Sequence, residues 1–204
     1  MAVPLSLRFW LFALLLTAAV WALLREPAAP TVLAELPEAL VGEPDLYLER
    51  ASISQYGEPG RLKYELLAHR IRHFEADAIT RLTKPDLTLY NDSNNLPWQS
   101  TAGQGFIRQE IGPAGLPEEL VFLRENVELK QRDIDGRFLK LRTAHLYVYP
   151  DRQYAQTDQS VTIDTDVGRT KGASMTADLA AGRINLSADA KQRVQTIVLK
   201  DQFK

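Results

Sequence analysis

The sequence contains no cysteine and only three histidines. Without cysteine the chain cannot form a disulfide bond, use a thiol nucleophile, carry a lipid on an N-terminal cysteine or build a cysteine zinc site. The protein could still reside in an oxidising compartment, because 204 residues are enough to bury a core without disulfide bonds.

The chain also lacks an excess of either charge. Its formal net charge is -2, and 22 Lys and Arg balance 22 Asp and Glu from Asp45 onward, once the two arginines and four glutamates before it are set aside. Proteins that bind nucleic acid concentrate basic charge on one face. We therefore expect no nucleic-acid partner.

Motifs for catalysis, metals and cofactors are missing as well. His69 and His73 are four residues apart, but no HExxH pattern accompanies them and they lie within a strand pattern. The sequence Gly103-Gln104-Gly105 lacks the third glycine and the helix of a dinucleotide loop. A glycan hydrolase would need two carboxylates close together, and no spacing marks such a pair. We expect no enzymatic activity, no metal site and no cofactor.

One long apolar run is present, near the N-terminus. Phe9–Leu24 holds 16 residues without a charge, between Arg8 and Arg25. As a helix this run spans roughly 24 Å, and the apolar residues before it can extend it toward a membrane thickness of roughly 30 Å. We expect a transmembrane helix over residues 1–25. A cleaved signal peptide is the alternative, although the small residues at 32–34 lie well beyond the run.

A stalk is expected to follow, over residues 26–44. It contains four prolines and four glutamates, a composition that extends the chain and disfavours a helix.

The rest of the chain, residues 45–204, shows the pattern of antiparallel strands. Apolar residues alternate with polar ones, which indicates half-buried strands. A helix over Leu66–Phe74 fits equally well. Turn signals separate the runs at short intervals, which favours hairpins over units that alternate strand and helix. These turns are Gly57–Gly60, Asn91–Asn95, Gly112–Gly115, Asp133–Gly136, Pro150–Asp151 and Ala181–Gly182.

An alanine recurs along these hairpins. Ala68, Ala102, Ala144 and Ala177 each precede a further alternating run. A two-stranded unit cannot bury its own apolar face, so several units must stack and share one. We interpret the alanines as inward positions where the sheet bends sharply, or as narrow points in a lumen that holds a ligand.

Several segments together resemble one family. They are PDLYLERASISQYGEPG, RLKYELLAHRIRHF, LTKPDLTLY, PWQSTAGQG, NVELK, LRTAHLYVYPDRQYAQTDQSVTI and GASMTADLAAGRINL. With the N-terminal apolar run and the stalk, they are similar to the LptC family of lipopolysaccharide export proteins across nearly the whole chain.

The resemblance implies an all-β fold, a twisted, half-open antiparallel β-jellyroll of the OstA-like type, behind one transmembrane helix. It implies a single-pass inner-membrane protein with most of its chain in the periplasm. Such a protein receives lipopolysaccharide from the ATP-driven LptB/LptF/LptG transporter and passes it to the periplasmic bridge protein LptA. A membrane-anchored adaptor that tethers envelope proteins without binding lipid is the alternative.

A lipid-binding trough is expected on the inner face of this jellyroll. The resemblance assigns to it Ala51, Ile53, Leu82, Ile184 and Leu186. Alternation adds further apolar positions to the wall. These are Tyr64, Leu66, Leu87, Leu89, Val127, Leu129, Leu139, Leu141, Val148, Val161 and Ile163.

Partner proteins are expected at the two edges of the sheet, where backbone groups are free to pair. The first strand, marked by Leu46, Leu48 and Tyr56, is assigned to a jellyroll of the transporter. The last strands are assigned to the bridge protein and are marked by Gly182, Ala188, Val194 and Val198.

Overall fold

The structure is a computed structural model and describes residues 43–57, 60–90, 96–133, 135–190 and 192–199. The expected transmembrane helix (1–25) and nearly all of the expected stalk (26–44) lie outside these ranges. Within them, no helix is both long and apolar enough to span a membrane.

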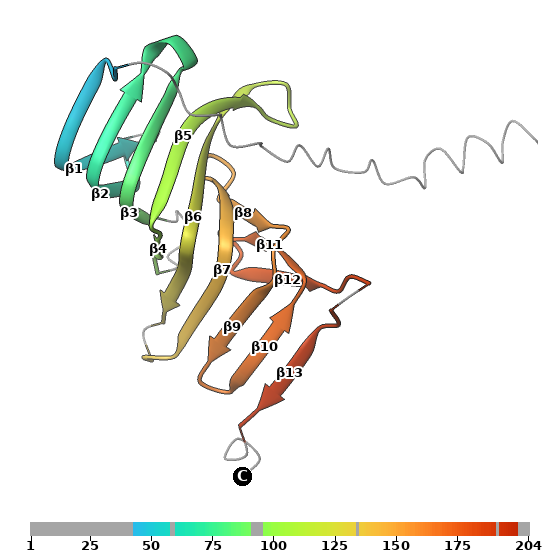
Figure 1. Cartoon of the computed structure of the whole chain (residues 1–204). Helices are drawn as coiled ribbons and strands as arrows, with labels where there is room; N and C mark the ends of the chain where they lie inside the picture. Colours follow the sequence, from blue (N-terminus) through green and yellow to red (C-terminus); the bar gives the residue numbers. More distant parts are fainter. Residues whose placement is uncertain (1–42, 58–59, 91–95, 134, 191, 200–204) are drawn as a thin grey trace, which may run out of the picture. The chain divides into compact units, whose positions relative to one another are not determined.

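The described part of the chain is an antiparallel β-structure, as expected (Figure 1). Its 13 strands join into one sheet, and a single 3-10 turn, Glu75–Asp77, lies between two of them. The strands are β1 (Leu46–Tyr56), β2 (Leu62–Phe74), β3 (Ile79–Leu89), β4 (Trp98–Thr101), β5 (Gln104–Ile111), β6 (Pro117–Arg132), β7 (Phe138–Tyr149), β8 (Tyr154–Thr157), β9 (Val161–Thr165), β10 (Gly168–Gly172), β11 (Ser174–Asp178), β12 (Arg183–Ser187) and β13 (Gln195–Val198).

The alternative of a helix over Leu66–Phe74 is decided in favour of a strand. These residues belong to β2, which pairs with β1 on one side and with β3 on the other. Tyr64, Leu66 and Ala68 are all buried, so the period of two determines the structure here.

A line of irregular residues crosses the sheet and bends it, and we call this line the crease. The regular pairing of β1, β2 and β3 skips one residue in each strand, and the pairing of β6 with β7 shifts between Arg124 and Val127. On the same line β4 gives way to β5, β8 to β9 and β10 to β11. The crease consists of Arg50, His69, Lys84, Ala102, Gly103, Glu125, Asn126, Ala144, residues 158–160 and Ala173.

Backbone conformation at the crease is unusual for the residue types found there. Arg50 has φ 48, Lys84 has φ 48, Glu125 has φ 67 and Asn126 has φ 57. Left-handed conformations in non-glycine residues are typical of β-bulges and sharp bends. The bend is therefore built into these four positions.

The crease divides the sheet into two walls. Wall 1 consists of residues 46–49, 70–74, 79–83, 104–111, 117–124, 145–149, 154–157, 174–178 and 183–187. Wall 2 consists of residues 51–56, 62–68, 85–89, 98–101, 127–132, 138–143, 161–165, 168–172 and 195–198.

In β1, β2, β3 and β7, crossing the crease changes which residues point inward. In β2, the even-numbered Leu66 and Ala68 are buried before the crease, whereas the odd-numbered Ile71 is buried after it. In β7, the odd-numbered Leu141 is followed by the even-numbered Leu146. In β6 two extra residues are inserted, and the odd-numbered Leu123 and Val127 are buried on both sides of the crease. One extra residue at a bulge reverses the side-chain alternation, so the apolar residues of both walls reach the same interior.

The interpretation of the four recurring alanines is correct for two of them. Ala68 pairs with Ala51 next to the crease, and Ala102 lies in the crease itself. The inward assignment of Ala144 is wrong: its side chain is exposed, because the bulge at residues 125–126 turns it outward while Thr143 is buried. Ala177 is buried but lies in the middle of β11, away from the crease.

Aromatic side chains form a separate row on the outer face of wall 1. The rings of Phe106, Phe122 and Tyr147 are cross-strand neighbours, with centroid distances of 5.0 Å and 4.8 Å. All three side chains are buried. These rings therefore pack against one another on the outer face and form a cluster separate from the interior.

Strand β5 approaches β6 closely at Gly105, and a substitution there tests how tightly the two strands pack. A Cβ atom on Gly105 would lie 2.6 Å from the carbonyl oxygen of Phe122, a backbone atom that cannot rotate away. We expect Gly105→Ala to lower the free energy of unfolding of the full chain in detergent by about 1–3 kcal/mol. Urea unfolding followed by circular dichroism measures it. Gly57→Ala is the matched control, since its Cβ would meet no atom within 4 Å, and equal losses in both variants would contradict the prediction.

Candidate functional site

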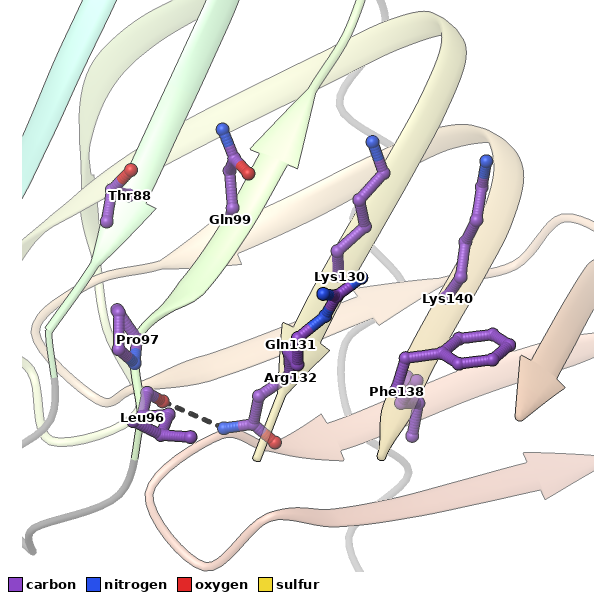
Figure 2. Close-up of a pocket in the computed structure, with 10 residues that line it drawn as sticks. Thr88, Leu96, Pro97, Gln99, Lys130, Gln131, Arg132, Phe138 and Lys140 are labelled. Carbon is purple, nitrogen blue, oxygen red and sulfur yellow. Dashed lines mark hydrogen bonds between the residues drawn. The ribbon is translucent and has the colours of Figure 1, made fainter. Parts of the chain in front are cut away.

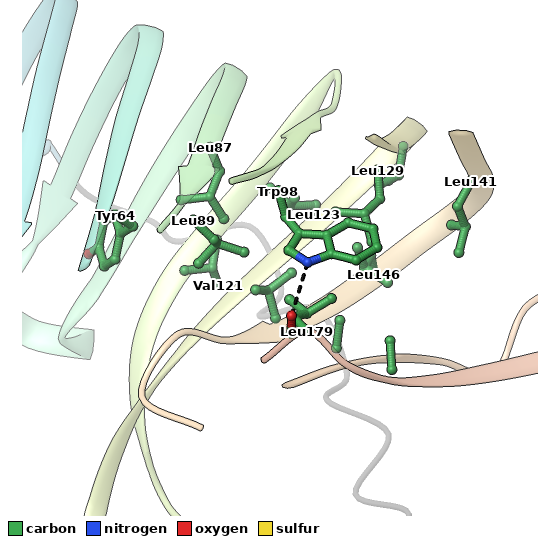
Figure 3. Close-up of a cluster of buried hydrophobic side chains, with 14 of the residues drawn as sticks. Tyr64, Leu87, Leu89, Trp98, Val121, Leu123, Leu129, Leu141, Leu146 and Leu179 are labelled. Carbon is green, nitrogen blue, oxygen red and sulfur yellow. Dashed lines mark hydrogen bonds between the residues drawn. The ribbon is translucent and has the colours of Figure 1, made fainter. Parts of the chain in front are cut away.

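The interior between the two walls contains all sixteen residues expected to line the trough. Figure 3 shows part of this cluster, including Tyr64, Leu87, Leu89, Leu129 and Leu141. Eleven of the sixteen are buried, namely Tyr64, Leu66, Leu82, Leu87, Leu89, Val127, Leu129, Leu141, Val148, Val161 and Ile163. Five are partly buried and pack against the same cluster, namely Ala51, Ile53, Leu139, Ile184 and Leu186. The structure thus brings them together as one apolar cluster, and their role in lipid binding stays a prediction.

Burial varies along this cluster in a regular way. Leu66, Leu87, Leu129 and Leu141, in β2, β3, β6 and β7, have an exposed fraction of 0%. Four of the five partly buried members lie near the edges, Ala51 and Ile53 on β1 and Ile184 and Leu186 on β12. The fifth, Leu139, lies at the start of β7. The middle of the interior is filled by its own side chains, whereas apolar surface is accessible at the first and last strands.

Other interior residues were not identified from the sequence. They are Ile71, Trp98, Val121, Leu123, Leu146, Ala155, Met175 and Leu179. Val121 and Leu123 are alternating apolar residues, so that signal was present. Trp98 carried no such signal, because its indole is placed by a contact with a distant part of the chain.

The strands expected to bind partners lie at edges of the sheet. Among the described strands, β1 pairs only with β2, and Leu46 and Tyr56 are exposed on it. Leu48 on the same strand packs against the interior cluster. The sheet therefore presents the outer edge of β1 for pairing.

The other end of the sheet forks into two edges. β12 pairs with β11 in wall 1, and β13 pairs with β10 in wall 2. Gly182 precedes β12 with φ 64, and Ala188 follows that strand. Val194 precedes β13 and Val198 ends it, and both valines are exposed.

Polar contacts join the two walls at their free margins, opposite the crease, and we call these contacts the clasp. Lys63 of wall 2 forms an ion pair with Asp151, in the turn after β7 of wall 1. The clasp comprises Lys63–Asp151, Tyr64–Glu119, Trp98–Leu179 and Tyr90–Gln153. Each contact joins a residue at the margin of wall 2 to a residue at the margin of wall 1, so the clasp holds the two walls together.

The residues of the clasp lie at or near the ends of strands. Trp98, the first residue of β4, donates from Nε1 to the carbonyl oxygen of Leu179 at 3.1 Å, just after β11 (Figure 3). The amide of Gln153 donates to the carbonyl oxygen of Tyr90 at 3.5 Å, a weak contact. Asp151 also accepts a hydrogen bond from the backbone N–H of Glu119 at 3.0 Å.

The Tyr64–Glu119 pair places a carboxyl group at the margin of the apolar interior. Burial raises the pKa of Glu119, while the hydrogen bond from Tyr64 and the charge of Lys63 oppose that rise and the charge of Asp151 adds to it. Burial and the neighbouring Glu119 also raise the pKa of the Tyr64 hydroxyl. Tyr64 is therefore a neutral donor, and the carboxyl group of Glu119 is less readily ionised than in water.

Arg152 supports the wall 1 side of the clasp. Its guanidinium donates to both oxygens of the buried Glu118, at 2.7 Å and 3.0 Å. The same guanidinium lies 4.3 Å from the ring centroid of Tyr149 and 5.1 Å from that of Tyr154. This bidentate pair fixes the start of β6 against the turn after β7.

A pocket of about 810 Å³ lies on the outer face of wall 2 (Figure 2). Thr88, Gln99, Lys130 and Lys140 form a row of cross-strand neighbours there, with Phe138 beside them. Glu128 forms ion pairs with Lys130 at 2.9 Å and with Lys140 at 2.5 Å. The two lysines that line the pocket are thus neutralised in part by Glu128. We therefore interpret the pocket as part of the solvent-exposed face of the sheet.

Together these features define an antiparallel jellyroll with an apolar interior, a clasped margin and strand edges at both ends. A similar fold occurs in the crystal structure of LptH from Pseudomonas aeruginosa, described as the LptA-homologous periplasmic component of the conserved lipopolysaccharide transport device. The TM-score is 0.51 at 10% sequence identity, and the match covers 67% of this chain and 94% of LptH.

The sequence identifies the family. Residues 11–195 match the family described as lipopolysaccharide-assembly, LptC-related, and the chain belongs to this family. The resemblance noted in the sequence is thereby confirmed. A search of curated proteins gives no match.

Arg152 provides a stability test of the clasp margin. We expect Arg152→Ala to lower the free energy of unfolding by about 2–4 kcal/mol, because the buried carboxylate of Glu118 would lose its bidentate partner. Denaturant unfolding of the full chain measures this loss. Arg137→Ala is the control: its ion pair with Asp133 is exposed to solvent, so its loss should change the free energy of unfolding very little. A loss in Arg152→Ala no larger than in this control would contradict the prediction.

Proposed function

We propose that this protein carries lipopolysaccharide from an inner-membrane transporter to a periplasmic bridge protein, with the acyl chains held between the two walls. The observation that carries this proposal is the apolar interior, which extends from the edge strand β1 to the edge strand β12. Membership in the LptC-related family gives the lipid class.

The interior has the chemistry that acyl chains require. Burying apolar surface releases about 25 cal/mol per Å², so several fatty chains in contact with leucine, isoleucine and valine side chains gain substantial binding free energy. Loading exchanges contacts between the walls for contacts with lipid. Sugars and phosphates stay in water outside, because burying them without partners is costly.

The edges suggest how lipid is handed on. The free edge of β1 would pair with a jellyroll of the LptF/LptG transporter, and the edges of β12 and β13 would pair with LptA. The similarity to LptH supports this arrangement, because two jellyrolls of one fold can continue each other's sheet and interior. Energy would come from the LptB ATPase, since this sequence contains no phosphate-binding loop.

The proposed membrane placement rests on the sequence. Residues 1–25 would form a single transmembrane helix in the inner membrane, and residues 26–44 would form a stalk that separates it from the periplasmic domain of residues 45–204. No catalytic step is assigned to the chain. The alternative, an adaptor that only tethers its partners, would use the same edges but would not take up lipid.

Photo-crosslinking separates the carrier from the adaptor. A photoreactive residue at Ile53, Leu82 or Ile184 should trap lipopolysaccharide, because these positions face the interior. The same residue at Glu128, on the outer face, should not. Gel-shift detection of lipopolysaccharide adducts in cells measures the difference. Equal trapping at Glu128, or none at the three interior positions, would favour the adaptor.

Proline substitution tests the C-terminal edges. Proline removes a backbone donor and blocks pairing, so Leu186→Pro or Val198→Pro should abolish capture of LptA. Membrane association should persist, because residues 1–25 are unchanged. Co-purification from membranes measures both properties. Undiminished capture of LptA by both variants would rule out these two edges as its binding site.

A further inference from the structure

The clasp closes the side of the jellyroll through which a glycolipid must enter. This inference rests on the proposed function. Acyl chains between the walls are joined to a bulky polar headgroup that stays in water, so the lipid cannot thread lengthwise through a closed interior. The margin opposite the crease must open to let the chains pass while the headgroup remains outside. We propose that the clasp is a gate for lipid loading and that Tyr64 and Glu119 control its opening.

The clasp contacts are placed where a gate would be needed. Lys63, Tyr64, Tyr90 and Trp98 come from β2, the end of β3 and the start of β4 in wall 2. Their partners come from the start of β6, the turn after β7 and the end of β11 in wall 1, namely Glu119, Asp151, Gln153 and Leu179. Opening the margin breaks these contacts and leaves the hydrogen bonds within each wall intact.

The closed clasp also contains polar atoms without partners. Oε1 of Glu119 and Oε1 of Gln153 are buried and accept no hydrogen bond within the described residues. A buried acceptor without a donor disfavours the state that contains it. Opening the margin would expose both oxygens to water, so the closed state is held less firmly than its number of contacts suggests.

Glu119 gives the gate a pH dependence whose sign follows from its surroundings. The groups that face it are Tyr64 and Lys63 from β2 and Asp151 from the turn after β7. Burial dominates and raises the pKa of Glu119 in the closed state above its value in water. The closed state therefore binds the proton more tightly than the open state, so acid favours closure and a rise in pH through this raised pKa favours opening.

Two substitutions at one contact should act in opposite directions. Tyr64→Phe removes the hydrogen bond to the Glu119 carboxylate, and should open the gate and speed loading about tenfold at neutral pH. Glu119→Gln keeps an acceptor for the Tyr64 hydroxyl without a buried charge, and should slow loading and abolish its pH dependence. Loss of fold alone could not produce this pair of results.

The measurement is the rate at which the full chain in detergent takes up fluorescent lipopolysaccharide, as a function of pH. Glu128→Gln on the outer face is the matched control and should load like the wild type. Because the sequence has no cysteine, Lys63→Cys with Asp151→Cys creates the only thiols in the chain. Joining them with a short thiol crosslinker should block loading, and a cleavable crosslinker should restore it on reduction.

The outcomes separate this gate from the carrier function. If the wild type takes up no lipopolysaccharide, the proposed function fails and the gate with it. If the wild type loads but the crosslinked chain loads equally fast, the gate is wrong and the carrier stands. Changes in the same direction in Tyr64→Phe and Glu119→Gln would overturn the assigned roles of these two residues.

Discussion

The structure depends on the extra residues at the crease, which reverse the side-chain alternation in β1, β2, β3 and β7 and preserve it in β6, where two residues are inserted. A strand that crosses a bend without an extra residue would point its apolar side chains inward on one wall and outward on the other. Here Leu66 faces the interior before the crease and Ile71 faces it afterwards, an odd number of residues later. One continuous sheet can therefore bury both of its walls against each other.

This arrangement has a local cost that burial offsets. A non-glycine residue in a left-handed conformation costs on the order of 1–3 kcal/mol, and Arg50, Lys84, Glu125 and Asn126 adopt one. A fully buried leucine contributes about 1.5–3 kcal/mol, and the interior contains several with no exposed surface. The bend persists because the residues on both sides of it are buried together.

The sequence was sufficient for the strand pattern and for the sixteen interior positions assigned to the trough, although not for the whole interior, and the reason is physical. Within each wall, alternation alone distinguishes Leu87 and Leu89 from their polar neighbours. The reversal is also visible, since apolar residues change between even and odd numbers along β2. Alternation does not show on which face of the sheet a side chain lies when its residue is at a bulge. Ala144 was assigned to the wrong face for this reason. The contacts of Trp98 and Lys63 join residues 81 and 88 positions apart, and no local pattern encodes them.

In the proposed function the same interior residues form the core and the lipid-binding site. Few substitutions can therefore change lipid binding without also changing stability. Replacing Leu129 or Leu141 would alter lipid contacts and wall packing together, because each fills the interior when no lipid is present. The clasp allows a smaller change: Tyr64 and Trp98 belong to the buried cluster, but their polar contacts lie at its margin, so Tyr64→Phe removes one hydroxyl and keeps the buried ring. The balance between a closed and an open jellyroll can therefore be set at Tyr64 and Glu119 while the crease and the leucines keep the two walls intact.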